Sequence, residues 1–154
     1  MHPTQEPITG SEHGINRTTA YGALVQFYNA FNSGNMESMS QNWANTPDIA
    51  MDNPLGGIKR GWNDIKSVYQ RIFDGTAELY VEFYDYTIHE GGDFFYAVGR
   101  ERGQFKANGQ VIQLAIRTSR IYKKINGKWK QVHHHGSIEN PELLKSYQQL
   151  VNNP

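Results

Sequence analysis

The sequence predicts an α+β fold in which about three helices pack on the concave side of one curved antiparallel sheet. Three observations predict it. Apolar residues keep helical spacing through much of residues 17–75, an alternating pattern follows over residues 76–138, and two Asn-Gly pairs interrupt the alternating part. Helices followed by a meandering sheet are the order of an α+β domain rather than of a parallel α/β sheet.

Three helices are expected before the long strands. Apolar residues recur at three- and four-residue steps over residues 21–31, and Gly34 ends this helix. A short second helix follows at residues 36–43. A short strand is expected at residues 48–53, and the clearest helical pattern covers residues 62–73.

Four long strands follow the helices. Asn-Gly favours a two-residue turn whose twist matches a hairpin, so we expect the last three strands to be antiparallel neighbours in series. The expected strands are 76–89, 93–106, 110–125 and 128–138, with Asn-Gly pairs at 108–109 and 126–127.

The chain is expected to form one domain with two terminal extensions. Residues 1–15 are polar and rich in proline and glycine, which predicts a flexible N-terminal arm. Residues 16–139 hold the patterns of the domain. Residues 140–154 are expected to form a closing helix and tail, with Asn140 as the cap and Pro141 in the first turn.

Size and composition fit this prediction. The chain has 154 residues, 38% of them apolar, and its 15 basic residues balance 15 acidic ones, so nothing suggests nucleic acid or an anionic membrane as a partner. Cysteine is absent, which excludes disulfides and thiolate chemistry. We expect a cytoplasmic protein, because no signal-peptide pattern and no apolar run of ~20 residues is present.

The last hairpin predicts which side chains share a face. Strict alternation from a two-residue loop puts Gln131, His133 and His135 on the face of Trp129, with His133 opposite Arg120. Trp129 most needs burial, so we take its face as the concave one. These residues are then expected to line the interior.

Arg120 beside two imidazoles has a chemical consequence. A fixed guanidinium charge opposes protonation of neighbouring histidines, and partial burial acts in the same direction. The group would be positive overall, which suits a carboxylate or another small anion. The alternative is a polar seam in which these side chains and nearby acids satisfy one another. Aromatic residues, among them Tyr28, Phe31 and Trp62, would form either pocket walls or a plain core.

The run His133-His134-His135 also raises the question of a metal. Successive strand residues point to opposite faces, so only His133 and His135 can share an ion. A third ligand would have to come from elsewhere, and Arg120 beside them disfavours a cation. We therefore expect no metal and no cofactor.

The face of Arg100 depends on the preceding hairpin. A strict two-residue loop at 108–109 leaves Arg100 and Arg117 outside together. One extra residue, such as a bulge at Gly99 or Gly103, would turn Arg100 inward. The pattern alone leaves both registers open.

Several of these features together resemble a known family. They are the order of elements, the segment Asn-Pro-Leu-Gly at 53–56, and the ending Gly-Lys-Trp through Val-His-His-His-Gly-Ser at 127–137. Over residues 17–138 they are similar to the SnoaL-like branch of the nuclear transport factor 2-like superfamily. The resemblance implies a cone-shaped, cystatin-like fold with an internal pocket.

Ketosteroid isomerase is one relative in that superfamily. Its pattern places Phe27 at the position of an oxyanion-donating tyrosine and Asn53 at that of a proton-shuttling aspartate. Phenylalanine has no hydroxyl, and an amide does not take up a proton at neutral pH. Asp52 is adjacent but should point to the opposite side of its strand. The isomerase mechanism is therefore not expected.

The association domain of calcium/calmodulin-dependent protein kinase II is another similar family. Its ending resembles residues 119–137, and the resemblance places two pocket arginines on Arg100 and Arg120, which favours the bulged register. Those domains assemble into rings. A homodimer is the more ordinary state of small free-standing members, and we expect the contact on the face of Ile121 and Val132.

The favoured function is binding of a small carboxylate-bearing or polyketide-like molecule in a basic, hydrophobic pocket. One alternative is a cofactor-independent isomerase or cyclase in which His133 or His135 moves a proton. The other is a dimerisation module with a filled core. Whether the chain is an enzyme stays open. The expected ligand-binding residues are Arg120, His133, His135, Arg100, Gln131, Trp129, Tyr28, Asn53 and Trp62.

Overall fold

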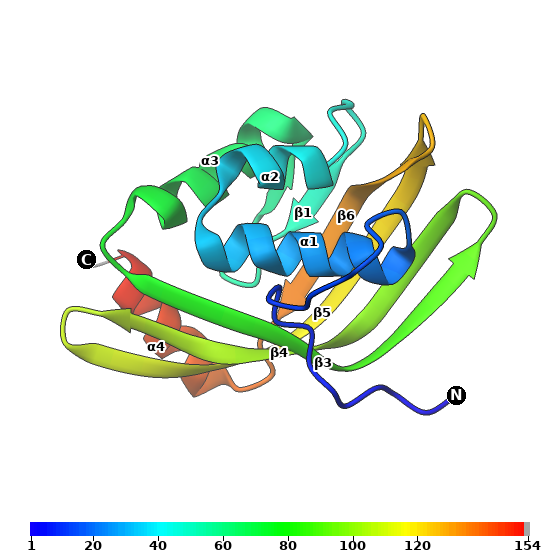
Figure 1. Cartoon of the computed structure of the whole chain (residues 1–154). Coiled ribbons are helices and arrows are strands. Elements are labelled where there is room, and N and C mark those ends of the chain that lie inside the picture. Colours follow the sequence, from blue (N-terminus) through cyan, green and yellow to red (C-terminus); the bar gives the residue numbers. More distant parts are fainter. Residues whose placement is uncertain (153–154) are drawn as a thin grey trace.

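One curved sheet with helices on its concave side forms the molecule, as the computed structural model shows for residues 1–152 (Figure 1). The α+β prediction is confirmed. The elements are α1 (Ala20–Ser33), α2 (Met36–Asn42), β1 (Ala50–Asp52), β2 (Ile58–Arg60), α3 (Gly61–Asp74), β3 (Glu78–Gly91), β4 (Phe94–Ala107), β5 (Gln110–Ile125), β6 (Lys128–Ser137) and α4 (Pro141–Asn152).

The sheet has the strand order β2-β1-β6-β5-β4-β3. Its neighbouring strands are antiparallel except β1 and β6, which run parallel with Ala50 beside His133. Both Asn-Gly pairs form the hairpin turns that the sequence predicts, with positive φ at Asn108 (54°) and Asn126 (52°). The meander β4-β5-β6 is therefore correctly predicted, and β3 extends it as the antiparallel neighbour of β4.

Helices α1, α2 and α3 lie across the concave face (Figure 1). The Thr19 side chain caps the start of α1, and Gly34 ends it in the left-handed conformation. Aromatic rings of α1 and α3 pack together between these helices, including Phe31 with Tyr69 at 6.2 Å and with Phe73 at 6.4 Å.

The bulged register of β4 that the family resemblance favours is wrong. Strand β4 pairs with β5 in strict alternation, with Arg100 opposite Arg117. Gly99 and Gly103 do not mark a bulge there. They allow close approach of β3 instead: a Cβ at Gly103 would lie 1.8 Å from the carbonyl oxygen of Tyr80.

The N-terminal segment is not the loose arm that its composition predicts. Thr4 and Ile8 form isolated β-bridges with β3, and their amides donate to the carbonyls of Tyr86 and Phe83, each at 2.8 Å. Ile8 is fully buried in the core. The backbone hydrogen bonds and the buried Ile8 side chain together hold this segment at the sheet edge.

Helix α4 closes one end of the curved sheet (Figure 1). It buries Tyr147 and Leu150, and the Tyr147 ring packs against Phe105 at 5.2 Å. The expected tail at residues 153–154 lies outside the described residues. Within residues 1–152, no helix is both long and apolar enough to cross a membrane. The cytoplasmic location stays a prediction.

Candidate functional site

A cavity of about 490 Å³ lies between the sheet and the helices. This volume is in the range of small-molecule sites, ~300–1,000 Å³. Apolar side chains from several elements line it, including Phe27, Phe31, Val68, Ile72, Leu79, Leu114, Ile116, Tyr147 and Leu150. The cavity therefore lies toward the end that α4 covers.

A buried polar group also faces this cavity, formed by Glu101 from β4, Arg120 from β5 and His134 from β6. All three are buried, with 6%, 2% and 6% of their surface exposed. Nη2 of Arg120 lies 3.6 Å from Oε1 of Glu101, and the same carboxylate oxygen accepts a hydrogen bond from Thr118. The group thus holds one buried ion pair and one imidazole.

Arg120 is fixed from several sides. Its Nη1 donates to Oε1 of Gln131 at 2.8 Å and its Nε donates to the hydroxyl of Tyr28 at 3.4 Å. Its guanidinium carbon lies 3.6 Å from the centre of the Phe27 ring, a cation–π geometry. Burial alone would lower the pKa of Arg120, but Tyr28 and Glu101 raise it above the ordinary value. The guanidinium is therefore always charged, and Glu101 compensates it.

His134, and not His133 or His135, is the inward-facing histidine. The register shifts between Tyr122 and Ile121, which pair with Gln131 and His133, so Val132 is an extra residue. This bulge puts His134 opposite Arg120 and reverses the predicted faces, because strict alternation fails at a bulge. The prediction that His133 and His135 line the interior is wrong.

His134 is a neutral imidazole. Burial, and then the charge of Arg120, hold its pKa well below the ordinary value of 6.5. Its Nδ1 lies 3.2 Å from the carbonyl oxygen of Ser119, so Nδ1 carries the proton and donates. Nε2 is left as an acceptor.

The other predicted site residues lie at different distances from the cavity. Asn53 lines the cavity with Arg120, although its Oδ1 also accepts from the amide of Leu55 at 2.9 Å. Gln131 and Tyr28 do not line the cavity but hold Arg120 from behind. These contacts fit the alternative prediction of a polar seam, in which the polar side chains satisfy one another.

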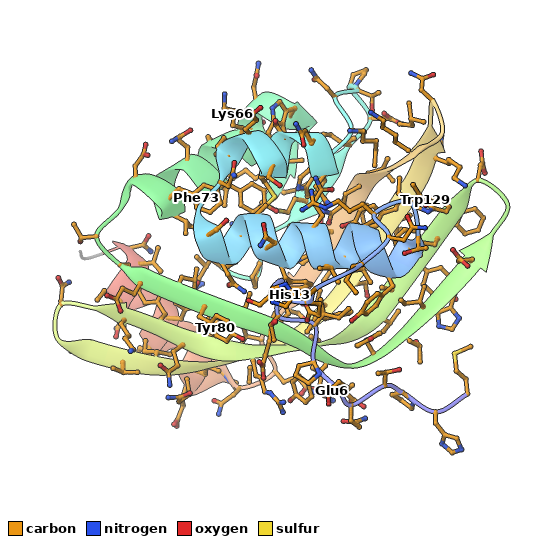
Figure 2. The ribbon with its side chains drawn as sticks, viewed as in Figure 1. Glu6, His13, Lys66, Phe73, Tyr80 and Trp129 are labelled. Carbon is orange, nitrogen blue, oxygen red and sulfur yellow. The ribbon has the colours of Figure 1, made fainter. Side chains whose placement is uncertain are left out.

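Trp129 and Trp62 do not line the cavity. Trp129 packs edge-on against Phe95 at 4.9 Å, beneath Lys124. It lies across the molecule from Phe73 of α3 (Figure 2). Trp62 is partly buried against the core at the start of α3. Both tryptophans pack in or against the core, as the plain-core alternative predicts. Neither forms a wall of the cavity.

Arg100 lies on the outer face, with a side chain 46% exposed that pairs with Glu139 at 3.1 Å. The inward position implied by the family resemblance is wrong, because β4 and β5 keep strict alternation. The same alternation turns Glu101 inward. Its place between two glycines on the face of Phe95 and Phe105 was the signal that could have identified it.

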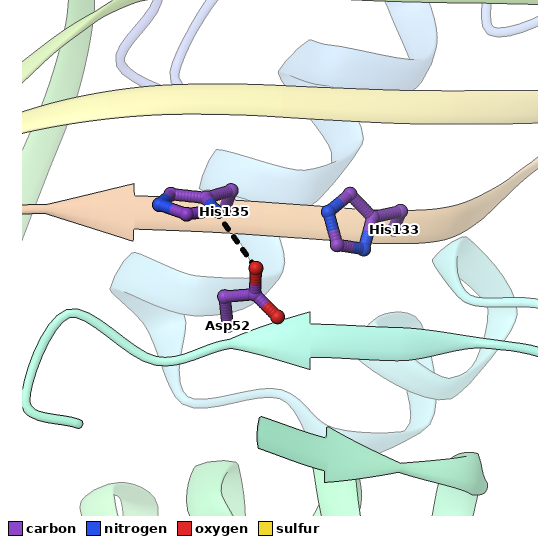
Figure 3. Close-up of side chains that lie close together, drawn as sticks. All are labelled: Asp52, His133 and His135. Atoms are coloured by element: carbon purple, nitrogen blue, oxygen red, sulfur yellow. Dashed lines mark ion pairs between the residues drawn. The ribbon is translucent and has the colours of Figure 1, made fainter. Parts of the chain in front are cut away.

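A second cluster lies on the outer face, formed by Asp52 of β1 with His133 and His135 of β6 (Figure 3). Nδ1 of His135 lies 2.8 Å from Oδ2 of Asp52, and Nδ1 of His133 lies 3.1 Å from the carbonyl oxygen of Ala50. Asp52 is therefore the third possible ligand, for which the sequence analysis named no residue. Arg120 points to the opposite face.

Comparison with known families identifies the domain. A model of the SnoaL-like domain matches residues 22–141. The chain belongs to the SnoaL-like domain family. None of the curated proteins searched matches this SnoaL-like domain significantly.

Solved structures share its fold. A protein with a cystatin-like fold from Caulobacter vibrioides is 20% identical, with a TM-score of 0.66 over 88% of this chain and 98% of the other. A protein assigned as a calcium/calmodulin-dependent protein kinase type II association domain, from Thiobacillus denitrificans, is 22% identical, with a TM-score of 0.64 over 79% and 96%. A protein assigned as a ketosteroid isomerase, from Shewanella frigidimarina, is 21% identical, with a TM-score of 0.64 over 80% and 98%. At these identities the likeness shows the fold alone.

Proposed function

We propose that this SnoaL-like domain binds a small, mostly apolar molecule with a polarised carbonyl or enol oxygen, of the polyketide-like kind. The observation that carries the proposal is the cavity of about 490 Å³ with apolar walls and the buried Glu101–Arg120–His134 group on one side. Pockets of this composition hold a ligand by apolar contact and orient it with a few polar groups.

The charges of this group favour a neutral ligand over a carboxylate. Arg120 is compensated by Glu101, and His134 is neutral, so the net charge of this buried group is close to zero. A carboxylate held at this group would be desolvated next to Glu101, where Arg120 is already paired, and the other cations that line the cavity, Lys59 and Arg71, are not buried. A carbonyl oxygen needs only a hydrogen-bond donor, which Arg120 has in excess of its partners.

Thermal unfolding in the presence of matched ligands tests the proposal. Bicyclic ketones such as 2-tetralone should raise the melting temperature, while 2-naphthoic acid of similar size should raise it less. Leu114→Trp fills the cavity from β5 and should abolish the ketone effect. Val111→Trp is the matched control, because Val111 lies on the same strand but is 55% exposed and outside the cavity.

Two results would contradict the proposal. Equal ketone stabilisation of wild type and Leu114→Trp would mean that the ligand binds elsewhere. Stronger stabilisation by the acid than by the ketone would refute the assigned ligand class and leave the cavity as the binding site.

A second candidate is proton transfer on the bound ketone. The carboxylate of Glu101 and Nε2 of His134 are both proton acceptors on the cavity wall. The lowered pKa of His134 makes it a weak base, which is why binding is the first proposal. The test follows exchange of the α-hydrogens of bound 2-tetralone for deuterium by NMR. Exchange should slow in His134→Gln and persist in His13→Gln, and an unchanged rate in His134→Gln would exclude this histidine.

We also propose that two copies associate through the outer face of the sheet. Phe94, Tyr96 and Val98 stand in a row on β4 and are 44%, 39% and 44% exposed, next to Ile121 of the predicted contact face. Light scattering should give the mass of two chains for wild type and for Val111→Lys, and of one chain for Val98→Lys. A wild-type mass of one chain would reject the homodimer.

A further inference from the structure

We propose that Asp52, His133 and His135 form a binding site for a divalent transition metal of the zinc class on the outer face of the sheet. The site is separate from the cavity and does not depend on its ligand. It reverses the sequence-based expectation of no metal, because the structure removes both reasons for that expectation. Asp52 supplies the third ligand, and Arg120 lies on the opposite face.

The strand pairing brings the three side chains together. Strands β1 and β6 are parallel neighbours, with Ala50 beside His133 and Asp52 beside His135. The two histidines are two residues apart on one strand, so both project from the same face as Asp52 (Figure 3). One donor atom from each residue lies within 4.8 Å of the other two.

His133 is already oriented as a metal ligand. Its Nδ1 lies 3.1 Å from the carbonyl oxygen of Ala50 and donates its proton there. This contact fixes the ring and leaves Nε2 with a free lone pair. Histidine ligands in metal sites usually have such a second partner on the other ring nitrogen.

His135 and Asp52 supply the other two donors. Their side chains are 54% and 30% exposed, and Nδ1 and Oδ2 are 2.8 Å apart. An ion would replace the proton shared by these atoms. Donors around a tetrahedral zinc ion are roughly 3.3 Å apart, so rotation of these partly exposed side chains is enough to reach His133, and water can occupy the fourth position.

Two arginines, Arg100 and Arg117, line the same outer hollow as His135, but each is paired with Glu139, at 3.1 and 3.3 Å. Because these charges are compensated, the surroundings do not exclude a cation. On the side of β5 the site is flanked by Ile121 and Ser119, which carry no charge. On the side of β2 the flanking residues by register are Ile58 and Arg60, and Arg60 is exposed beside Ala50 rather than beside Asp52. Two imidazole nitrogens and one carboxylate oxygen suit zinc and its transition-metal neighbours better than calcium or magnesium.

Calorimetric titration of the chelator-treated, tag-free full chain with zinc tests the proposal. We expect one ion per chain. The affinity should fall at least tenfold in His135→Gln, whose side chain is 54% exposed, and also in His133→Gln and Asp52→Asn. His13→Gln removes an exposed imidazole far from the site and should bind like wild type.

Cobalt provides a second measurement, because its visible spectrum reports coordination by the protein. The spectrum should appear in wild type and vanish in His135→Gln. Equal zinc affinity in wild type and His135→Gln, or one ion for every two chains, would overturn the proposal. An equal loss in His13→Gln would do so as well, since it would indicate general surface binding.

Discussion

The two ends of the space between sheet and helices differ in how they are filled. At the Trp129 end, Phe95 stacks on Tyr122 at 4.6 Å and meets the Trp129 ring edge-on. Asn42 accepts a hydrogen bond from Tyr122 there and donates to the carbonyl of Ala23. At the α4 end, the cavity takes the place of such packing.

The boundary between the two ends is the ion pair of Arg120 and Glu101. Gln131 connects this pair to the filled end, where its Nε2 donates to Asn42 at 3.2 Å. Glu101 and His134 face the cavity. The filled end therefore holds the polar group in place, while the hollow end leaves it room to contact a ligand.

The largest expected contrast comes from deleting an aromatic ring at each end. Phe95→Ala should lower the free energy of unfolding by about 4 kcal/mol, as for other buried rings. Phe31→Ala should lower it by about half as much, because Phe31 is only partly buried and already borders the cavity. Urea unfolding measures both, and equal losses would show that the ends do not differ in packing.

Breaking the ion pair at the boundary has the next largest effect. Glu101→Gln leaves the Arg120 charge buried without its carboxylate and should lower the free energy of unfolding by about 3 kcal/mol. The double variant Glu101→Leu, Arg120→Met removes both charges and should lose less than the sum of its single variants. Additive losses in urea unfolding would argue against direct coupling of the two side chains.

Enlarging one side chain at each end gives a smaller difference in stability between the filled end and the hollow end. Ala97→Leu, at a fully buried position outside the cavity, should destabilise the chain by about 2 kcal/mol through overpacking. Leu114 lines the cavity, so the larger ring in Leu114→Phe has room there. This substitution should change the free energy of unfolding by less than about 1 kcal/mol. The same chemical unfolding series measures both, and a larger loss in Leu114→Phe would contradict the cavity.

The smallest expected effect is the pH dependence from His134. Its pKa is lower in the folded chain than the ordinary 6.5 of an unfolded one, so the unfolded chain binds more protons below pH 6.5. Stability should therefore fall as the pH drops below about 6.5, by up to ~1.4 kcal/mol per pH unit. Unfolding at pH 7.5 and 5.5 should show a smaller difference in His134→Gln than in His13→Gln. Identical differences would mean that His134 is not the group responsible.

The sequence predicts the architecture because each element has a local physical signal. Helical spacing and Gly34 define α1, and the two Asn-Gly pairs define the hairpins of the meander. The parallel pairing of β1 with β6 has no such local signal. It depends on how the two halves of the chain pack together.

The candidate site is predicted only in part. Arg120 was placed correctly because it shares a face with Trp129 and Tyr122 before the bulge. His134 was missed because nothing in Gln131-Val132-His133 marks an extra residue. Glu101 was missed for another reason: the glycines beside it suggested a bulge, while their function is to admit β3.

The bulge at Val132 decides which side of the sheet each histidine of the run faces. One extra backbone residue acts as a phase shift: His134 faces the cavity, and its two neighbours face outward with Asp52. Deleting that residue would exchange inside and outside along the rest of β6, and would change both groups in one step. The chemistry of this strand is therefore more sensitive to its length than to the identity of any one of its residues.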